Sequence, residues 1–263
     1  MSSLVTRVRL QQIAKMIEKG KRLDGRGVGD YREIKIEQGL IEKAEGSARV
    51  LLGKTEVLVG VKVETGTPFP DTPNDGVMTV NAELVPLASP TFEPGPPDEN
   101  SIELARIVDR GIRESKAIDT AKLVIEPGKK VFVVFVDIYV LNHDGNLIDA
   151  SALAAVSALL NTKMPNYEVK DGEVIIKQGY TPLPLKSHPI TVTLGKINNK
   201  LIVDAWLEEE QVIDARLTMA INDEGNICAI QKGCAGYFTQ QQILEGMKLA
   251  REKAAELRKK LKW

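Results

Sequence analysis

Residues 130–160 constrain the fold of this chain more than any other stretch. They begin with a run of valines and phenylalanines that leaves neither face polar, so we expect a strand covered on both faces. A polar segment at 142–146 then favours a tight turn. From Asp149 the sequence is rich in alanine, which predicts a helix that packs closely on a sheet. Such a strand, turn and helix often binds anions, because the helix N-terminus presents unpaired N–H groups and a positive dipole end.

Composition limits the class of protein and of ligand. The 263 residues are 43% hydrophobic and 27% charged, so the chain can bury a substantial core in one large domain or two intimate halves. The net charge of −1 requires any nucleic-acid contact to come from a local basic patch. Cys228 and Cys234 have no neighbouring histidine, so we expect no metal and no cofactor. Without a signal peptide or bilayer-length apolar run, we expect a cytoplasmic protein without membrane contact.

Groups of strands alternate with helices along the chain, which predicts a mixed α+β protein built in layers. We expect a surface helix at 4–19, a helix at 102–117 capped by Ser101, and a closing helix at 239–260. The predicted buried stripe of the 239–260 helix consists of Ile243, Leu244, Met247, Ala250, Ala254 and Leu257. Strands are predicted at 34–36, 48–52, 55–62, 78–84, 131–136, 174–177, 190–194, 201–205, 215–222 and 227–232. Strands followed by a helix occur before and after the middle, which is consistent with a structural duplication.

Four motifs occur in the same order as in the RNase PH-type phosphorolytic 3′-5′ exoribonucleases, and the chain resembles that family over about residues 20 to 255. They are Arg22-x-Asp24-Gly25-Arg26, Glu103-x-x-Arg106-x-x-x-Arg110-x-x-Arg113, the Asp144-Gly145 turn, and Ile230-Gln231-Lys232-Gly233. The resemblance implies the RNase PH fold, a duplicated β/α domain like domain 2 of ribosomal protein S5. It further implies an N-terminal helical extension at 1–29, a first domain at 30–165 and a second at 188–255, packed as one unit.

Three further segments, at 70–74, 91–100 and 124–129, look like one branch of this family. That branch is the non-catalytic RNase PH-like subunit of the archaeal exosome ring. The resemblance implies a hexameric ring of three heterodimers with a catalytic RNase PH-type partner. It also implies cap subunits with S1 or KH domains, and single-stranded RNA as the substrate.

The positions that bind phosphate in active family members hold different kinds of residue in this chain. By the resemblance, active members place a hydroxyl and a guanidinium at the central turn, where phosphorolysis needs a site for the attacking anion. The matching positions here are Asn146, Leu147 and Ile148, which offer neither group. We also expect Asp149 to act as the helix N-cap and to occupy the N–H groups that a phosphate requires.

The proton donor of active members is also missing on this alignment. The family's catalytic aspartate falls on Arg216, and a second carboxylate position holds Glu210. An arginine cannot donate a proton at neutral pH. We therefore expect no catalytic residue in this chain, and we interpret the acidic run at 208–210 as a solvated face and not a metal site.

Three arginines on the 102–117 helix are the candidate RNA-binding residues. Arg106, Arg110 and Arg113 are spaced by four and three residues, which places them on one helical face. Ion pairing with Glu103 or Asp109 is the structural alternative, and the residues alone leave both interpretations open. The resemblance implies that Arg106 and Arg110, with Arg113 as a third, face RNA.

Two other functions stay open at this point. The chain is an active phosphate-dependent exoribonuclease if the purified protein releases nucleoside diphosphates from RNA. A small-molecule kinase of the fold-related GHMP type is the other alternative, although the Gly-Leu-Ser-Ser turn of that family is absent. ATP binding by the isolated protein would support the kinase.

Overall fold

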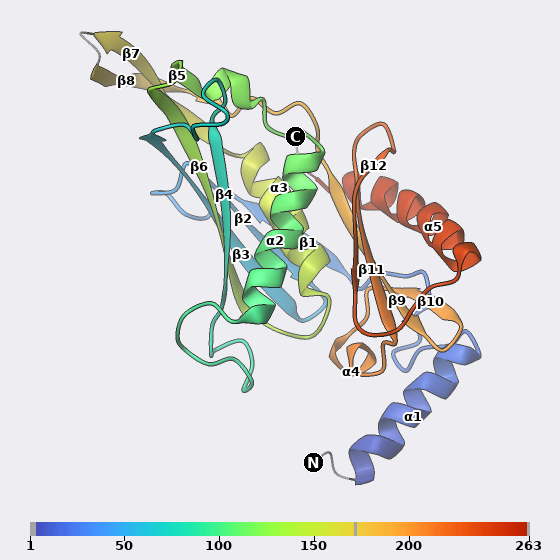
Figure 1. The fold of residues 1–263 in the computed structure, drawn as a ribbon. Helices are drawn as coiled ribbons and strands as arrows, with labels where there is room; N and C mark the ends of the chain where they lie inside the picture. The colour runs from blue at the N-terminus through green and yellow to red at the C-terminus, as the bar shows by residue number, and fades with distance from the viewer. Residues whose placement is uncertain (1–3, 171–172, 262–263) are drawn as a thin grey trace.

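Two sheets enclose a pair of helices in the computed structural model, which describes residues 4–170 and 173–261. Helices α2 (Glu99–Glu114) and α3 (Leu147–Leu160) lie between a first sheet, on the left in Figure 1, and a second sheet on the right. Helix α5 (Gln240–Arg258) covers the outer side of the second sheet. This layering agrees with the α+β class that the sequence predicts.

The first sheet has the strand order β1-β2-β3-β6-β4, with β5 paired to β6. Its pairs are antiparallel apart from β4 and β6, which run parallel. Parallel strands need a crossover, and α2 lies in the connection from β4 to β6. The strands are β1 (Ile34–Gln38), β2 (Gly46–Leu52), β3 (Thr55–Gly66), β4 (Val77–Leu84), β5 (Val124–Glu126) and β6 (Lys130–Asn142), with the 3₁₀ helix η1 (Thr120–Leu123) before β5.

Strand β6 has one buried face and one partly open face. Phe132, Val134 and Ile138 are buried on the inner side, where α2 and α3 lie. On the outer side Phe135 is half-buried and Tyr139 is 37% exposed. No helix among the described residues packs on this outer face. The expectation of cover on both faces is therefore wrong for the single chain, because an apolar run does not say which chain covers it.

The second sheet has the order β10-β9-β11-β12 and is antiparallel throughout. Every residue of β9 is buried, because α3 packs against one side of the sheet and α5 against the other. A turn at 223–226 joins the last two strands. The elements are β9 (Ile190–Ile197), β10 (Lys200–Val203), α4 (Leu207–Glu210), β11 (Ala215–Ile221) and β12 (Ile227–Gly233).

A two-stranded ribbon separates the two sheets in the sequence. Strands β7 (Lys163–Lys170) and β8 (Glu173–Pro182) pair with each other and project from the body at the upper left of Figure 1. The sequence predicted one short strand at 174–177 within a connecting segment. It missed β7 because Pro165 argues against a strand, and the register shifts beside this proline.

Two helices differ from prediction at their N-terminal ends. Asp98, and not Ser101, caps α2, since its Oδ1 accepts from the backbone N–H of Ser101 at 2.8 Å. In α5 the first predicted core residues, Ile243 and Leu244, are 36% and 53% exposed. Of the other predicted members, Ala250, Ala254 and Leu257 are buried and Met247 is half-buried.

Helix α1 (Leu4–Glu18) builds a separate small core beside the second sheet. Its Ile13 and Ile17 are buried against Ile197 and Ile202. Helix α1 is thereby packed on β9 and β10, which come much later in the sequence, and this packing sets up the contacts of the site below. No helix among the described residues is long and apolar enough to cross a membrane.

Candidate functional site

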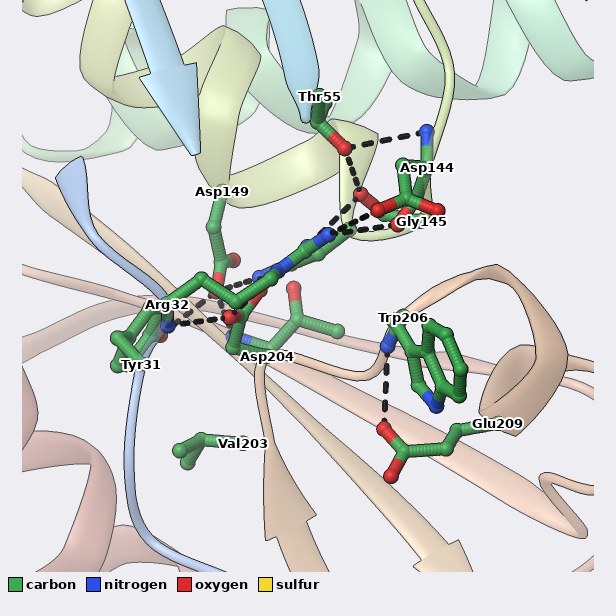
Figure 2. A network of polar contacts seen from close by, with 12 residues as sticks. Tyr31, Arg32, Thr55, Asp144, Gly145, Asp149, Val203, Asp204, Trp206 and Glu209 are labelled. Carbon is green, nitrogen blue, oxygen red and sulfur yellow. Dashed lines mark hydrogen bonds and ion pairs between the residues drawn. The ribbon is translucent and has the colours of Figure 1, made fainter. Parts of the chain in front are cut away.

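The turn that joins β6 to α3 is held from several parts of the chain. Gly145 has a φ of +84°, and a Cβ there would lie 2.5 Å from the backbone nitrogen of Leu207, so the position requires glycine. The Thr55 hydroxyl donates to the Gly145 carbonyl oxygen at 2.6 Å and accepts from the N–H of Asp144 at 3.2 Å (Figure 2). Asn146 follows with a left-handed φ of +54° and is the N-cap residue of α3.

Asp204 is the centre of a buried ion-pair network beside this turn. Its carboxylate accepts from Arg32 at 2.7 and 2.9 Å and from Arg26 at 2.7 Å. Burial alone would raise the pKa of Asp204, but the hydrogen bonds and charge of Arg32 hold it below its ordinary value. Arg32 also donates to the carbonyl oxygens of Asp144 at 2.7 Å and Gly145 at 3.2 Å, so the network fixes the turn (Figure 2).

A second buried pair ties the N-terminal segment to the second sheet. Arg22 and Glu209 form a fully buried ion pair, with Nε to Oε1 at 2.9 Å. Arg22 also donates to the carbonyl oxygens of Val203 at 2.9 Å and Asp204 at 2.7 Å. Arg22 and Arg26 are the arginines of the first family-like motif, so this motif connects distant elements of the fold.

Asp149 does not cap α3, and the prediction that it blocks the helix N–H groups is wrong. The helix begins at Leu147, which places Asp149 inside the first turn. Its buried Oδ2 accepts from the Tyr31 hydroxyl at 2.7 Å, the N–H of Thr193 at 3.1 Å and Nδ2 of Asn146 at 3.1 Å. Burial raises the pKa of Asp149 to about 6. The carboxylate therefore joins α3 to the second sheet.

A different carboxylate occupies the start of α3. Glu210 Oε1 accepts from the backbone N–H of Asn146 at 2.8 Å, and burial raises the pKa of Glu210 to about 7. A pocket of about 280 Å³ lies beside this contact. Its lining includes Asn146, Leu147, Ile148, Glu210 and Arg216. The three degenerate positions therefore face the same pocket as the two positions that align with the family's carboxylates.

Arg216 is held at the border of this pocket. Its Nη2 lies 2.5 Å from Glu103 Oε1 on α2. Gly233 makes room for the guanidinium, since a Cβ there would lie 2.8 Å from Nη2. Where active relatives are expected to place an acid, this chain has an ion-paired arginine.

The three candidate RNA-binding arginines differ in how they are paired. Arg106 is exposed, and no acidic side chain of the described residues lies within ion-pair distance of it. Arg110 is also exposed, and its nearest acid, Glu114, is 3.9 Å away. Glu103, a predicted structural partner, pairs with Arg216 instead. The structural alternative thus has little support for Arg106 and Arg110.

Arg113 does follow the structural alternative in part. Its guanidinium donates to Asp109 at 3.0 and 2.7 Å and to the carbonyl oxygen of Met78 at 3.1 Å. These bonds raise the pKa of Arg113, with the Asp109 carboxylate as the main cause. Arg113 is therefore less available to a ligand than the two arginines before it.

The same arginines border a groove of about 410 Å³ between α2, β4 and the 67–76 loop, here called the Phe69 groove. Phe69 lines it and is 55% exposed. The sequence analysis did not select this residue, which lies just before the family-like segment at 70–74. The available signal was a lone aromatic side chain in an otherwise polar loop.

Comparison with family models matches both parts of the chain. Residues 30–165 match domain 1 of the 3′ exoribonuclease family, RNase PH, and residues 187–253 match domain 2 of the same family.

Known proteins agree with these matches. The chain is 56% identical to the exosome complex component Rrp42 of Thermococcus kodakarensis over 95% of this chain and 92% of that protein. It is 50% identical to Rrp42 of Methanopyrus kandleri over 98% of this chain and 97% of that protein.

Solved structures show the same fold. A chain of the Archaeoglobus fulgidus exosome with RNA bound to the active site superposes with a TM-score of 0.92 at 49% identity, covering 99% of this chain and all of that one. Rice Rrp46 superposes with a TM-score of 0.70 at 17% identity, over 90% of this chain and 97% of that one. The last likeness concerns the fold alone. The expected RNase PH fold is confirmed.

Proposed function

The chain belongs to the 3′ exoribonuclease family of RNase PH-like proteins, and we propose that it is a non-catalytic subunit of an RNA-degrading exosome ring. In this ring it pairs with a catalytic RNase PH-type subunit as a trimer of heterodimers. One observation carries the non-catalytic part of the proposal. At the start of α3, no hydroxyl or cation is present at residues 146–148, and the Glu210 carboxylate takes the N–H of Asn146.

The chemistry of phosphorolysis explains why this matters. Inorganic phosphate attacks the RNA phosphodiester, so the site must hold one anion close to another and neutralise the charge that develops. Here a phosphate would meet the Glu210 carboxylate and the apolar side chains of Leu147 and Ile148. Arg216, the nearby cation, is already paired with Glu103. The missing hydroxyl and cation at residues 146–148, and the arginine in place of the family's catalytic aspartate, both oppose catalysis.

We propose that α2 and the Phe69 groove bind single-stranded RNA. Guanidinium groups suit phosphodiesters, because they stay charged and present paired donors. Arg106 and Arg110 are exposed and nearly free of acidic partners, with Arg113 as a weaker third contact. An exposed aromatic ring beside them, that of Phe69, suits base stacking, which tolerates any sequence.

Assembly is the third part of the proposal. The half-open outer face of the first sheet and the edge strands leave backbone and apolar groups uncovered in one chain. A closed ring removes such edges. Cap subunits with S1 or KH domains would guide RNA to the ring, and the complex would act in the cytoplasm.

The test is phosphorolysis by the purified chain, alone and with its catalytic partner. The chain alone should release no nucleoside diphosphates from a labelled oligoadenylate in phosphate buffer, whereas the reconstituted ring should release them. Steady release that scales with the amount of the isolated chain and follows it through gel filtration would overturn the proposal. That result would establish the active exoribonuclease instead.

A further inference from the structure

The pocket of about 280 Å³ beside Glu210 and Asn146, here called the α3 pocket, has an uneven balance of charge. Besides Glu210, its ionised lining residues are Glu103 and Arg216, and these two neutralise each other at a distance of 2.5 Å from Oε1 to Nη2. His143 also lines the pocket, and burial lowers the pKa of its ring, which leaves the ring uncharged near pH 7. Within this lining, the carboxylate of Glu210 is thus the charge that lacks a counter-ion.

One oxygen of Glu210 is free to meet a ligand. Oε1 accepts from the N–H of Asn146, but no described residue donates to Oε2 or pairs with it. Arg32 and Arg216 attract the carboxylate from a distance, and neither lies within ion-pair range of it. Asp149 Oδ1 is sealed in the interior, whereas Glu210 Oε2 keeps accessible surface and its residue lines the α3 pocket. A cation that enters the pocket can therefore reach this oxygen.

The rest of the lining suits a hydrocarbon chain. Leu84, Leu147 and Ile148 supply apolar surface. Phe92 adds an aromatic wall, which is held by stacking on the His143 ring with centroids 5.4 Å apart. A metal ion needs several ligand side chains, and the described parts of the chain contain no cluster of three or more histidines, cysteines or carboxylates that could hold one. The lining therefore fits an organic cation and not a metal ion.

We propose that the α3 pocket binds an aliphatic ammonium group, which donates to Glu210 Oε2 while its hydrocarbon chain packs on Leu147 and Ile148. Hydrogen bonds between ionised partners are about twice as strong as neutral ones. The ammonium comes from a free amine or from a lysine side chain of a neighbouring subunit, and the experiment below separates these sources. The inference goes beyond the proposed function, because it concerns the isolated chain and needs neither RNA nor catalysis.

Isothermal titration of the full chain with cadaverine, an aliphatic diamine, at pH 8 tests the site. Pentanediol, which has the same length and no charge, should bind at least about tenfold more weakly. Glu210→Gln should weaken cadaverine binding by about ten- to a hundredfold, the contribution of one hydrogen bond to a charged group. The variant should fold, since glutamine still accepts from the Asn146 N–H. Thr91→Trp, at an exposed position of the lining, should block the pocket.

The matched control is Glu208→Gln, two positions earlier on α4. Glu208 pairs with Arg9 on α1 and does not line the α3 pocket, so this variant should bind cadaverine like the unaltered chain. A general attraction of amines to acidic surface would instead weaken equally in the two glutamine variants.

The pH dependence of binding gives a second readout. The charged and titratable groups around Glu210 and the α3 pocket are those of Arg32, Glu103, His143, Asp149, Asp204 and Arg216. Burial raises the pKa of Glu210 to about 7, so its ionised fraction rises about tenfold between pH 6 and pH 8. Cadaverine affinity should rise by the same factor, with release of a proton that titrations in buffers of different ionisation enthalpy detect. Glu210→Gln should abolish both effects.

The outcomes decide both the site and the source of the ammonium. Equal affinity of cadaverine for the unaltered chain and Glu210→Gln, or equal binding of cadaverine and pentanediol, would overturn the inference. Binding to the isolated chain and to the reconstituted ring would identify a free amine as the ligand. Binding to the isolated chain alone would identify a lysine of a neighbouring subunit. Failure of the ring to assemble would count against the proposed function, while the titrations of the isolated chain would still decide the site.

Discussion

The carboxylate of Glu210 accepts a hydrogen bond from the backbone N–H of Asn146 at 2.8 Å, although the two residues are 64 positions apart. The contact joins α4 to the residue that begins α3. It places an internal negative charge at the helix end that would favour an anion. The subunit thus carries its own acid where a phosphate is expected in active relatives.

The burial of the Glu210 carboxyl makes the stability of the fold depend on pH. Burial raises the pKa of Glu210 to about 7 from an ordinary 4.5, so the folded chain holds this proton more tightly than the unfolded chain. The stabilisation is therefore complete below pH 4.5 and is lost as the pH rises through about 7. Such a shift corresponds to at most about 3 kcal/mol.

Glu210→Gln should remove most of that loss, because Gln keeps an acceptor for the Asn146 N–H without a charge. We expect the variant to be more stable than the unaltered chain at pH 8 and to differ little at pH 5, as measured by urea denaturation. Asp149, whose pKa is about 6, changes stability in the same direction and remains in the variant. If the stability of the two proteins depends on pH in the same way, Glu210 is not a source of the pH dependence.

The stability of the fold should be more sensitive to substitutions in the Asp204 network than in the other polar clusters. Asp204→Asn removes the buried carboxylate that Arg26 and Arg32 share, and these arginines keep only the more exposed carboxylates of Asp24 and Asp144. The substitution should destabilise the chain by about 3 kcal/mol. The control is Glu208→Ala, which removes a partly exposed pair with Arg9 and should cost less than about 1 kcal/mol. Denaturant midpoints give both numbers, and a loss below 1 kcal/mol for Asp204→Asn would show that the network is not structural.

Arginines 106 and 110 should govern RNA binding through charge. Replacing both with alanine should weaken binding and lower the salt slope by about 0.7 for each lost phosphate contact. Lysine should rescue only in part, because it lacks the paired donors of guanidinium. Arg113→Ala should change the slope less, since Asp109 already pairs with this side chain. Ring assembly is measured in parallel. A double variant that assembles normally and binds RNA like the unaltered protein at every salt concentration would refute the RNA-binding role of the two arginines.

Phe69 should contribute to RNA binding by stacking on a base and not by charge. Phe69→Ala removes an exposed ring from the Phe69 groove and should weaken RNA binding by about 1 to 3 kcal/mol, the range for one base stacked on an aromatic side chain. The salt slope should stay constant, because no cation is lost. Phe69→Tyr serves as the control and should bind normally. Equal affinity of the alanine variant would place the RNA elsewhere.

The open face of the first sheet should matter for assembly and not for folding. Tyr139 is 37% exposed and lies in one row with Leu58 on β3 and Glu83 on β4. Tyr139→Lys should leave the thermal midpoint of the isolated chain nearly unchanged, because the lysine would face Glu83 on the neighbouring strand. It should reduce the hexamer fraction formed with the catalytic partner in sedimentation. A full hexamer with the variant would exclude this face from the ring contacts.

The sequence predicted the central elements well, because their signals are local. The apolar run located the first half of β6, which continues from the predicted end at 136 to Asn142. The turn at 144–145 and the alanine-rich segment located the start of α3 to within two residues. Local signals were weaker at the helix starts, where Asp98 and Ser101 are both good caps and only the hydrogen bond decides. They failed for β7, whose strand contains a proline and pairs only with β8.

At the candidate site, too, some features follow from the sequence alone and others only from the tertiary structure. The sequence by itself determined which chemical groups are absent, since residues 146–148 contain no hydroxyl or cation in any fold. It also placed three arginines on one helical face, because helical spacing is a local property. Only the tertiary structure decided which charges are neutralised. Arg113 pairs within its helix and Arg216 pairs across to Glu103, whereas Arg106 stays free of acidic partners among the described residues.

The tertiary structure alone also decided what occupies the start of α3. Asp149 is adjacent in sequence and was the expected cap, but its carboxylate turns to Tyr31 and Thr193. The carboxylate of Glu210 arrives there because α4 follows β10 on the neighbouring sheet. Ionic and hydrogen-bonding partners depend on distance in space, which residues far apart in the sequence acquire only when the sheets and helices pack.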